Sequence, residues 1–174
     1  MLPALEPPHP QQLRRRAIGA ATLLVLAALV VAAQWWSGAK VRDRSLNSAW
    51  QTLAALEQAA PEERRDLMMK AQDRFSRSAA VLSLEPLAMI GVAVAERMPD
   101  HWGQPLPLPP VATQCSEAEA AVWLRSALEH GKPQEALRWA AEPAIRRRGE
   151  LAPLLRFAQG WQRAIEAQKT PTRP

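Results

Sequence analysis

The sequence predicts an all-α protein in which one N-terminal transmembrane helix precedes a small bundle of antiparallel helical hairpins. Three observations support this fold class. Residues 17–36 are twenty consecutive residues without a charged side chain. After them, apolar residues recur at spacings of three and four, which places them on one face of a helix. Ala and Leu dominate the composition, and no alternating strand pattern with tight hairpin turns interrupts them.

The uncharged segment has the length and the flanks of a membrane-spanning helix. At about 1.5 Å of rise per residue it would extend for roughly 30 Å, the thickness of a bilayer's hydrocarbon core. Arginines precede it, and two tryptophans, which favour the headgroup region, end it. The residues expected to form the membrane anchor are Arg14, Arg15, Arg16, Leu23, Leu26, Leu29, Trp35 and Trp36.

Two fates are open to this segment: it stays as an anchor, or it is removed as a signal peptide. Small residues before Ala33 and Ala39 would suit cleavage. The length of the apolar run and the Pro-rich tail before it favour an uncleaved anchor. Contiguous arginines favour a cytoplasmic N-terminus, although a similar number of basic residues follows the segment. We therefore expect a single-pass protein of the bacterial inner membrane whose C-terminal domain is periplasmic.

Changes in composition divide the chain into six segments. Prolines indicate irregular chain before the predicted span and between two helical stretches. The expected segments are a Pro-rich cytoplasmic tail (1–16), the transmembrane helix (17–36), a first helical segment (37–98), a Pro-rich linker (99–116), a second helical segment (117–168) and a disordered tail (169–174).

Proline, glycine and capping signals predict where the helices begin and end. An amphipathic helix ends near residue 60, and Pro61 with two following glutamates begins the next one. Ser116 and Glu119 form a capping box at the start of a helix that ends at Gly131. A further helix starts at Pro133, and the last one covers about 150–167.

The Pro-rich segment 99–116 has two interpretations. It contains five prolines and one glycine and has no helical periodicity. It is either a linker between two helical halves or a strap that packs on the surface through Trp102, Leu106 and Leu108.

Residues 121–143, AVWLRSALEHGKPQEALRWAAEP, resemble a tetratricopeptide repeat. Trp123, Ala127, Gly131 and Ala136 lie where that family places a large residue, a small residue, the turn glycine and the small residue of the second helix. Residues 74–86, RFSRSAAVLSLEP, are a looser echo of the second helix and its closing proline. The resemblance implies closely packed helical hairpins that bind other proteins.

The sequence does not indicate an enzyme. It has no phosphate-binding loop, no dinucleotide-binding fingerprint and no zinc-protease helix. His101, Cys115 and His130 are the residues that would form a Cys–His nucleophile or a metal site, but neither their spacing nor their surroundings support one. We expect no catalytic residue, no cofactor and no bound metal, and a Cys/His enzyme is the least favoured alternative.

The C-terminal region is basic, since residues 138–174 carry eight basic and three acidic side chains. Such a surface suits membrane lipid or an acidic surface on another envelope protein, whereas nucleic acid is not expected in a periplasmic compartment. An exposed tryptophan would add an interface anchor. The candidates for partner binding are Trp102, Arg138, Arg146, Arg147, Arg148 and Arg156.

These features together predict a membrane-anchored helical scaffold that mediates protein–protein interactions. We expect an accessory subunit of a bacterial envelope complex, of the secretion, pilus or conjugation type. The alternative is a secreted or periplasmic binding domain that is released when the N-terminal segment is cleaved.

Overall fold

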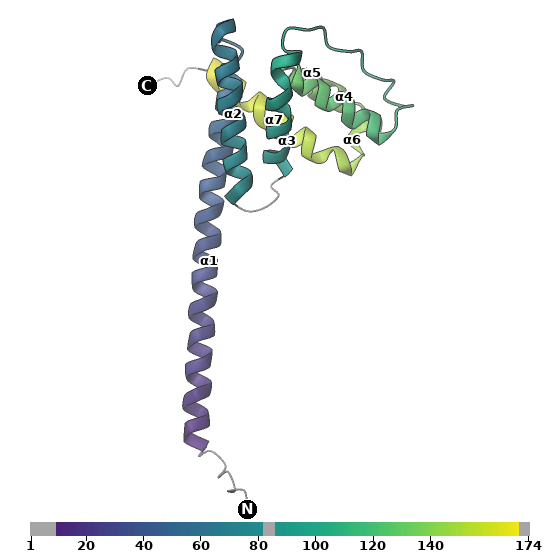
Figure 1. Ribbon diagram of the computed structural model, residues 1–174. Helices are drawn as coiled ribbons and strands as arrows, with labels where there is room; N and C mark the ends of the chain where they lie inside the picture. Colours follow the sequence, from purple (N-terminus) through teal and green to yellow (C-terminus); the bar gives the residue numbers. More distant parts are fainter. Residues whose placement is uncertain (1–9, 82–85, 171–174) are drawn as a thin grey trace, which may run out of the picture. The chain divides into compact units, whose positions relative to one another are not determined.

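The computed structural model describes the chain at residues 10–81 and 86–170, and its side chains at residues 21–33, 40, 43–79 and 86–170. All regular structure in these ranges is helical, so the predicted all-α class is confirmed for the described part (Figure 1). The elements are α1 (Pro10–Ala55), α2 (Pro61–Val81), α3 (Pro86–His101), α4 (Glu117–Glu129), α5 (Pro133–Ala140), α6 (Pro143–Arg146), the 3₁₀ helix η1 (Gly149–Leu151) and α7 (Ala152–Lys169).

The chain divides into two compact units, Met1–Lys40 and Val41–Pro174. In the first unit the described large apolar side chains of α1 are exposed, Leu23 by 69% and Leu26 by 53%. Among the residues that the structure describes, none of the helices is both long and apolar enough to span a bilayer.

Helix α1 begins and ends earlier than its pattern predicts. An irregular tail was expected up to residue 16, but α1 begins at Pro10, because the first position of a helix does not need an amide hydrogen. Its end lies at Ala55 rather than near residue 60. The amides of Leu56, Glu57 and Gln58 donate to carbonyls three residues earlier, at 3.2, 3.3 and 3.2 Å, and this tight turn buries Leu56.

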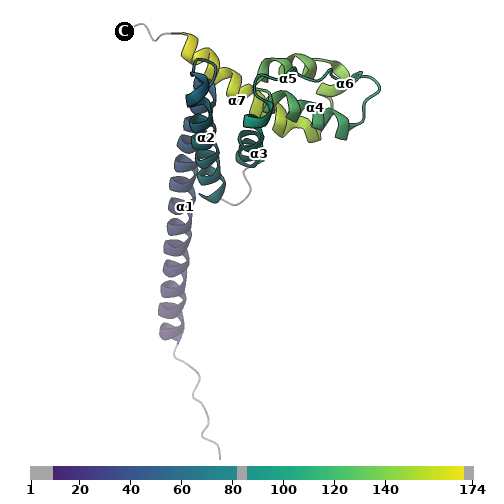
Figure 2. The same ribbon diagram turned by 45° about the horizontal axis from the view of Figure 1, so that its top comes forward.

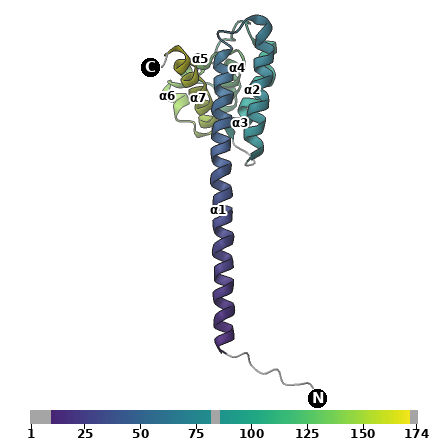
Figure 3. The same ribbon diagram turned by 90° about the vertical axis from the view of Figure 1, so that its left-hand side faces the viewer.

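Helices α2 and α3 form an antiparallel hairpin, in which they lie side by side in both rotated views (Figures 2 and 3). Helix α2 begins at Pro61 as predicted, with two glutamates in its first turn. The Arg74 guanidinium on α2 donates to the Ser48 carbonyl at 3.0 Å and to the Thr52 hydroxyl. These bonds satisfy a buried hydroxyl and fasten α2 to the last turns of α1.

Helices α4 and α5 form a second hairpin whose ends follow the predicted signals. The Ser116 hydroxyl accepts from the Glu119 amide at 3.2 Å, and the Ser116 amide donates to the Glu119 carboxylate at 2.6 Å. These hydrogen bonds lower the pKa of Glu119. Gly131 makes the turn with a φ of 72°, and a Cβ there would lie 2.4 Å from the Trp102 ring. Both its backbone and its neighbour therefore require glycine.

Residues 102–116 pack against α4 as a strap. The Trp123 indole nitrogen donates to the Pro107 carbonyl at 3.1 Å, and Leu106 is half-buried beside the core. Leu108 is 91% exposed, so the prediction that it packs on the surface is wrong. The strap residues that pack against the core are Trp102, Leu106 and Ala112, and the strap is bonded to α4 through the Pro107 carbonyl, so Leu108 lies outside these contacts.

The core of the unit Val41–Pro174 is centred on aromatic rings from three helices. The Phe157 ring on α7 lies 5.6 Å from Phe75 on α2, 6.2 Å from Trp50 on α1 and 6.3 Å from Trp161, measured between ring centroids. Phe75, Phe157 and Trp161 are fully buried. Helix α7 therefore holds the last turns of α1 and the α2–α3 hairpin together.

Candidate functional site

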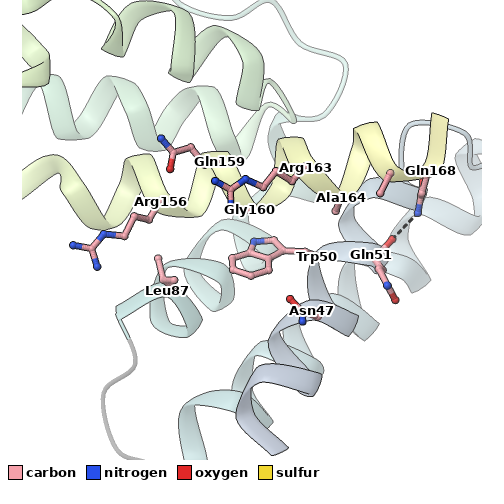
Figure 4. Close-up of a pocket in the computed structure, with 11 residues that line it drawn as sticks. Asn47, Trp50, Gln51, Leu87, Arg156, Gln159, Gly160, Arg163, Ala164 and Gln168 are labelled. Atoms are coloured by element: carbon pink, nitrogen blue, oxygen red, sulfur yellow. Dashed lines mark hydrogen bonds between the residues drawn. The ribbon is translucent and has the colours of Figure 1, made fainter. Parts of the chain in front are cut away.

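An open groove of about 690 Å³ lies between α1, α3 and α7 within the unit Val41–Pro174 (Figure 4). Its volume falls in the range of roughly 300–1,000 Å³ that is typical of ligand sites. The lining residues are Asn47, Trp50 and Gln51 from α1, Leu87 from α3, and Arg156, Gln159, Gly160, Arg163, Ala164, Ala167 and Gln168 from α7.

The floor of the groove is the Trp50 indole, which packs tightly under α7. A Cβ at Gly160 would lie 2.5 Å from the Trp50 ring, so glycine is needed for this close approach. The buried Trp50 indole nitrogen has no hydrogen-bond acceptor within the described part of the chain. An aromatic ring held in this way offers a rigid apolar surface to a ligand.

The rim of the groove is basic and rich in amides. Arg156 and Arg163 are both exposed on α7, and Figure 4 shows Arg163 above Trp50 and Arg156 farther along the same helix, with its guanidinium directed away from the indole. The Gln168 side-chain nitrogen donates to the Gln51 carbonyl at 3.1 Å, which closes one end of the groove (Figure 4). No carboxylate is among the lining residues that the structure describes. The groove therefore favours negatively charged ligands.

Of the six partner-binding candidates from the sequence, Arg156 is the one that lines this groove. Arg138, Arg146 and Arg147 are exposed elsewhere on the C-terminal helices. The Arg148 guanidinium donates to the Cys115 carbonyl at 2.6 Å and so has a structural role.

Trp102, the remaining candidate, is half-buried rather than free. Its ring packs on Gly131, and the Arg64 guanidinium lies 5.7 Å from the ring centroid. These contacts make it a packing residue with one open edge.

The anchor residues Arg14, Arg15, Arg16, Trp35 and Trp36 lie outside the side chains that the structure describes. For Leu23, Leu26 and Leu29 the described exposures are 69%, 53% and 61%.

Two histidines that the enzyme alternative would need, His101 and His130, lie beside each other, and neither is among the contacts of Cys115. The rings of His101 and His130 lie 5.0 Å apart, and His101 Nε2 lies 3.8 Å from the buried Glu129 carboxylate. The contacts recorded for the Cys115 thiol are with Ala112 and Arg148. Within the residues described, no group of histidine, cysteine and acidic side chains has the arrangement of a metal site.

No protein-family model, curated protein or solved structure matches this chain. Sequence reasoning identified Arg156 through the basic region, but it did not identify Trp50, Gln51 or Leu87. The spacing of Asn47, Trp50 and Gln51 places them on one face of a helix. It does not indicate whether another helix will cover that face or leave it open to a ligand.

Proposed function

We propose that this protein is a single-pass membrane-anchored helical scaffold that mediates protein–protein interactions. Its role would be that of an accessory subunit in a bacterial envelope complex, of the secretion, pilus or conjugation type. The observation that carries the proposal is the uncharged segment 17–36 directly before a compact helical unit. The contiguous arginines before the segment support a periplasmic position for that unit.

The exposure of the middle of this segment supports an anchor. The large apolar side chains there are between 53% and 72% exposed: Leu23, Leu24, Val25, Leu26, Leu29, Val30 and Val31. Leu23 to Leu26 are consecutive and so cover every side of a helix. A helix that is apolar all round needs an apolar environment on every side, as lipid provides.

The second hairpin supports the tetratricopeptide-like part of the proposal. Ala127 on α4 and Ala136 on α5 are fully buried, and Gly131 makes the turn between these helices. Buried small residues allow two helices to approach closely, which is the packing that the repeat requires.

Membrane extraction tests the anchor. The full chain should remain in the pellet after alkaline carbonate washing and should be released by detergent. The double variant Leu26→Arg/Leu29→Arg should shift to the soluble fraction, because each central arginine costs about 3 kcal/mol in insertion. Leu108→Arg, at a leucine that is 91% exposed outside the segment, should stay in the pellet.

Two outcomes would contradict the proposal. A wild-type chain that stays soluble before any treatment has no anchor. A mature polypeptide whose mass corresponds to a start after Ala33 or Ala39 is a released domain instead.

A further inference from the structure

We propose that the groove between α1, α3 and α7 binds an acidic amphipathic helix of a partner protein. This inference builds on the proposed function, because it takes the ligand of the helical unit to be protein. It adds the chemical character of the partner and the residues that would contact it.

Charge selects an acidic partner. Arg156 and Arg163 are exposed, and neither forms an ion pair within the described residues. They are seven positions apart, so they lie on one face of α7 about 10 Å apart along its axis. Two carboxylates one heptad apart on a partner helix would have the same spacing. A guanidinium binds a carboxylate with two parallel hydrogen bonds, which adds geometric selectivity to the charge.

The floor and length of the groove suit a helix. The α7 residues that line it recur every three or four positions, from Arg156 to Gln168. This face extends for about 18 Å, or roughly three turns of a partner helix. Trp50 on α1, Leu87 on α3 and Gly160 on α7 give the groove an apolar floor, in which the indole packs directly against Gly160. Apolar side chains at spacings of three, four and seven on a partner helix would fill it.

The amide side chains favour protein over other anionic ligands. Asn47, Gln159 and Gln168 line the rim and offer both donors and acceptors, which suits the polar side chains of a peptide. Nucleic acids and lipid surfaces are bound mainly through many cationic side chains, and this groove has two.

Fluorescence anisotropy with a synthetic peptide tests the proposal on the full chain in zwitterionic detergent micelles. The probe is a labelled helical peptide about four turns long, with leucines on one face and glutamates one heptad apart beside them. Its controls are the same peptide with glutamines in place of the glutamates and one with the leucines scrambled. We expect saturable micromolar binding of the acidic peptide, and binding at least about tenfold weaker for both controls.

Matched variants locate the site. Arg156→Gln/Arg163→Gln should weaken binding of the acidic peptide about tenfold, since two charge-assisted contacts are removed. Arg146→Gln/Arg147→Gln removes the same charge from exposed positions outside the groove and should change affinity less than about threefold. Circular dichroism of each variant confirms that its helix content is retained.

The other outcomes overturn the proposal. Equal effects of the two double variants would mean that the peptide senses net charge alone. Equal binding of the glutamine peptide would remove the acidic partner. Displacement of the peptide by an equal concentration of short-chain phosphatidylglycerol would assign the groove to lipid. If the protein forms dimers and the dimer no longer binds the peptide, the groove would instead bind a second copy of this chain. If the extraction experiment shows that the chain has no membrane anchor, the peptide-binding results still stand. The two proposals can therefore fail independently.

Discussion

The Arg148 guanidinium donates a hydrogen bond to the backbone carbonyl of Cys115, 2.6 Å away and 33 positions earlier in the sequence. This bond joins the chain between α6 and η1 to the residue directly before the Ser116 cap of α4. A second guanidinium nitrogen lies 3.7 Å from the Cys115 sulfur. Arg148 therefore fixes the end of the strap, whereas the neighbouring Arg146 and Arg147 are exposed.

Replacement of Arg148 should destabilise the fold, unlike replacement of its neighbour. Arg148→Ala leaves the partly buried Cys115 carbonyl without its charged donor, which should lower the free energy of unfolding by about 2 kcal/mol. Arg147→Ala should change it by less than about 0.5 kcal/mol. Urea denaturation followed by circular dichroism measures both. Equal effects of the two variants would show that the bond contributes nothing.

Local signals account for the parts of the fold that the sequence predicted. The starts of α2 and α5 depend on Pro61 and Pro133, and the start of α4 on the Ser116–Glu119 capping box. Each signal acts within one helical turn, so no knowledge of the tertiary structure is needed to interpret it.

The candidate site depends on contacts that no local pattern contains. Arg148 and Arg156 look alike in the sequence, yet one bonds to a distant carbonyl and the other lines a groove. Trp50 and Gly160 are 110 positions apart, and their contact is a property of the packed core. Leu106 and Leu108 also look alike in the sequence, yet Leu106 packs against the core and Leu108 is 91% exposed.

The contact between Trp50 and Gly160 predicts an unusual effect of alanine in a helix. Gly160→Ala would normally stabilise α7 by up to about 1 kcal/mol. Here the added Cβ would lie 2.5 Å from the Trp50 ring, so we expect a net loss of roughly 1–3 kcal/mol. Gly149→Ala, where nothing lies within 4 Å, is the control and should be neutral or stabilising. Thermal denaturation of both variants provides the comparison. A Gly160→Ala protein as stable as the wild type would contradict the close contact between Trp50 and Gly160.

Trp102 distinguishes a packing role from an interface role. Its ring covers Gly131 and contacts the Arg64 guanidinium, so Trp102→Ala should lower the free energy of unfolding by about 2 kcal/mol. Leu108→Ala removes a side chain that is 91% exposed and should have little effect. Chemical denaturation measures both changes. If Trp102→Ala unfolds like the wild type, the tryptophan is available as a partner-binding residue after all.

The capping box predicts an acid-dependent contribution to stability. Hydrogen bonds from the Ser116 amide and hydroxyl hold the pKa of Glu119 below its usual value. A carboxylate whose pKa is lower in the folded state stabilises the fold above its unfolded pKa, and this contribution is lost as the pH falls through the folded value. Glu119→Gln keeps a side chain that can complete the box but has no charge. The difference in unfolding free energy between wild type and Glu119→Gln should therefore shrink as the pH is lowered from 7 to about 3.

Glu117→Gln is the matched control for this titration, because it removes a charge from the same helical turn without altering the capping box. The unfolding free energies of Glu117→Gln and Glu119→Gln should therefore differ at pH 7, and this difference should shrink as the pH is lowered. A pH-independent difference between wild type and Glu119→Gln would show that the carboxylate is not stabilised by the cap.

Buried Glu129 should prove dispensable for stability. Its side chain is 7% exposed, and the nearest nitrogens of Arg97 and His101 lie 3.8 Å from its carboxylate oxygens, which is longer than a hydrogen bond. One carboxylate oxygen has no hydrogen-bond partner within the described residues. Because desolvation of such a group offsets its attraction to Arg97, Glu129→Met should leave the unfolding free energy unchanged or raise it by about 1 kcal/mol. The Arg97 side chain is 64% exposed, so it does not become a buried, unpaired charge when the carboxylate is removed. Urea denaturation at neutral pH decides the matter: a loss of more than about 1 kcal/mol would mean that the carboxylate holds α3 and α4 together.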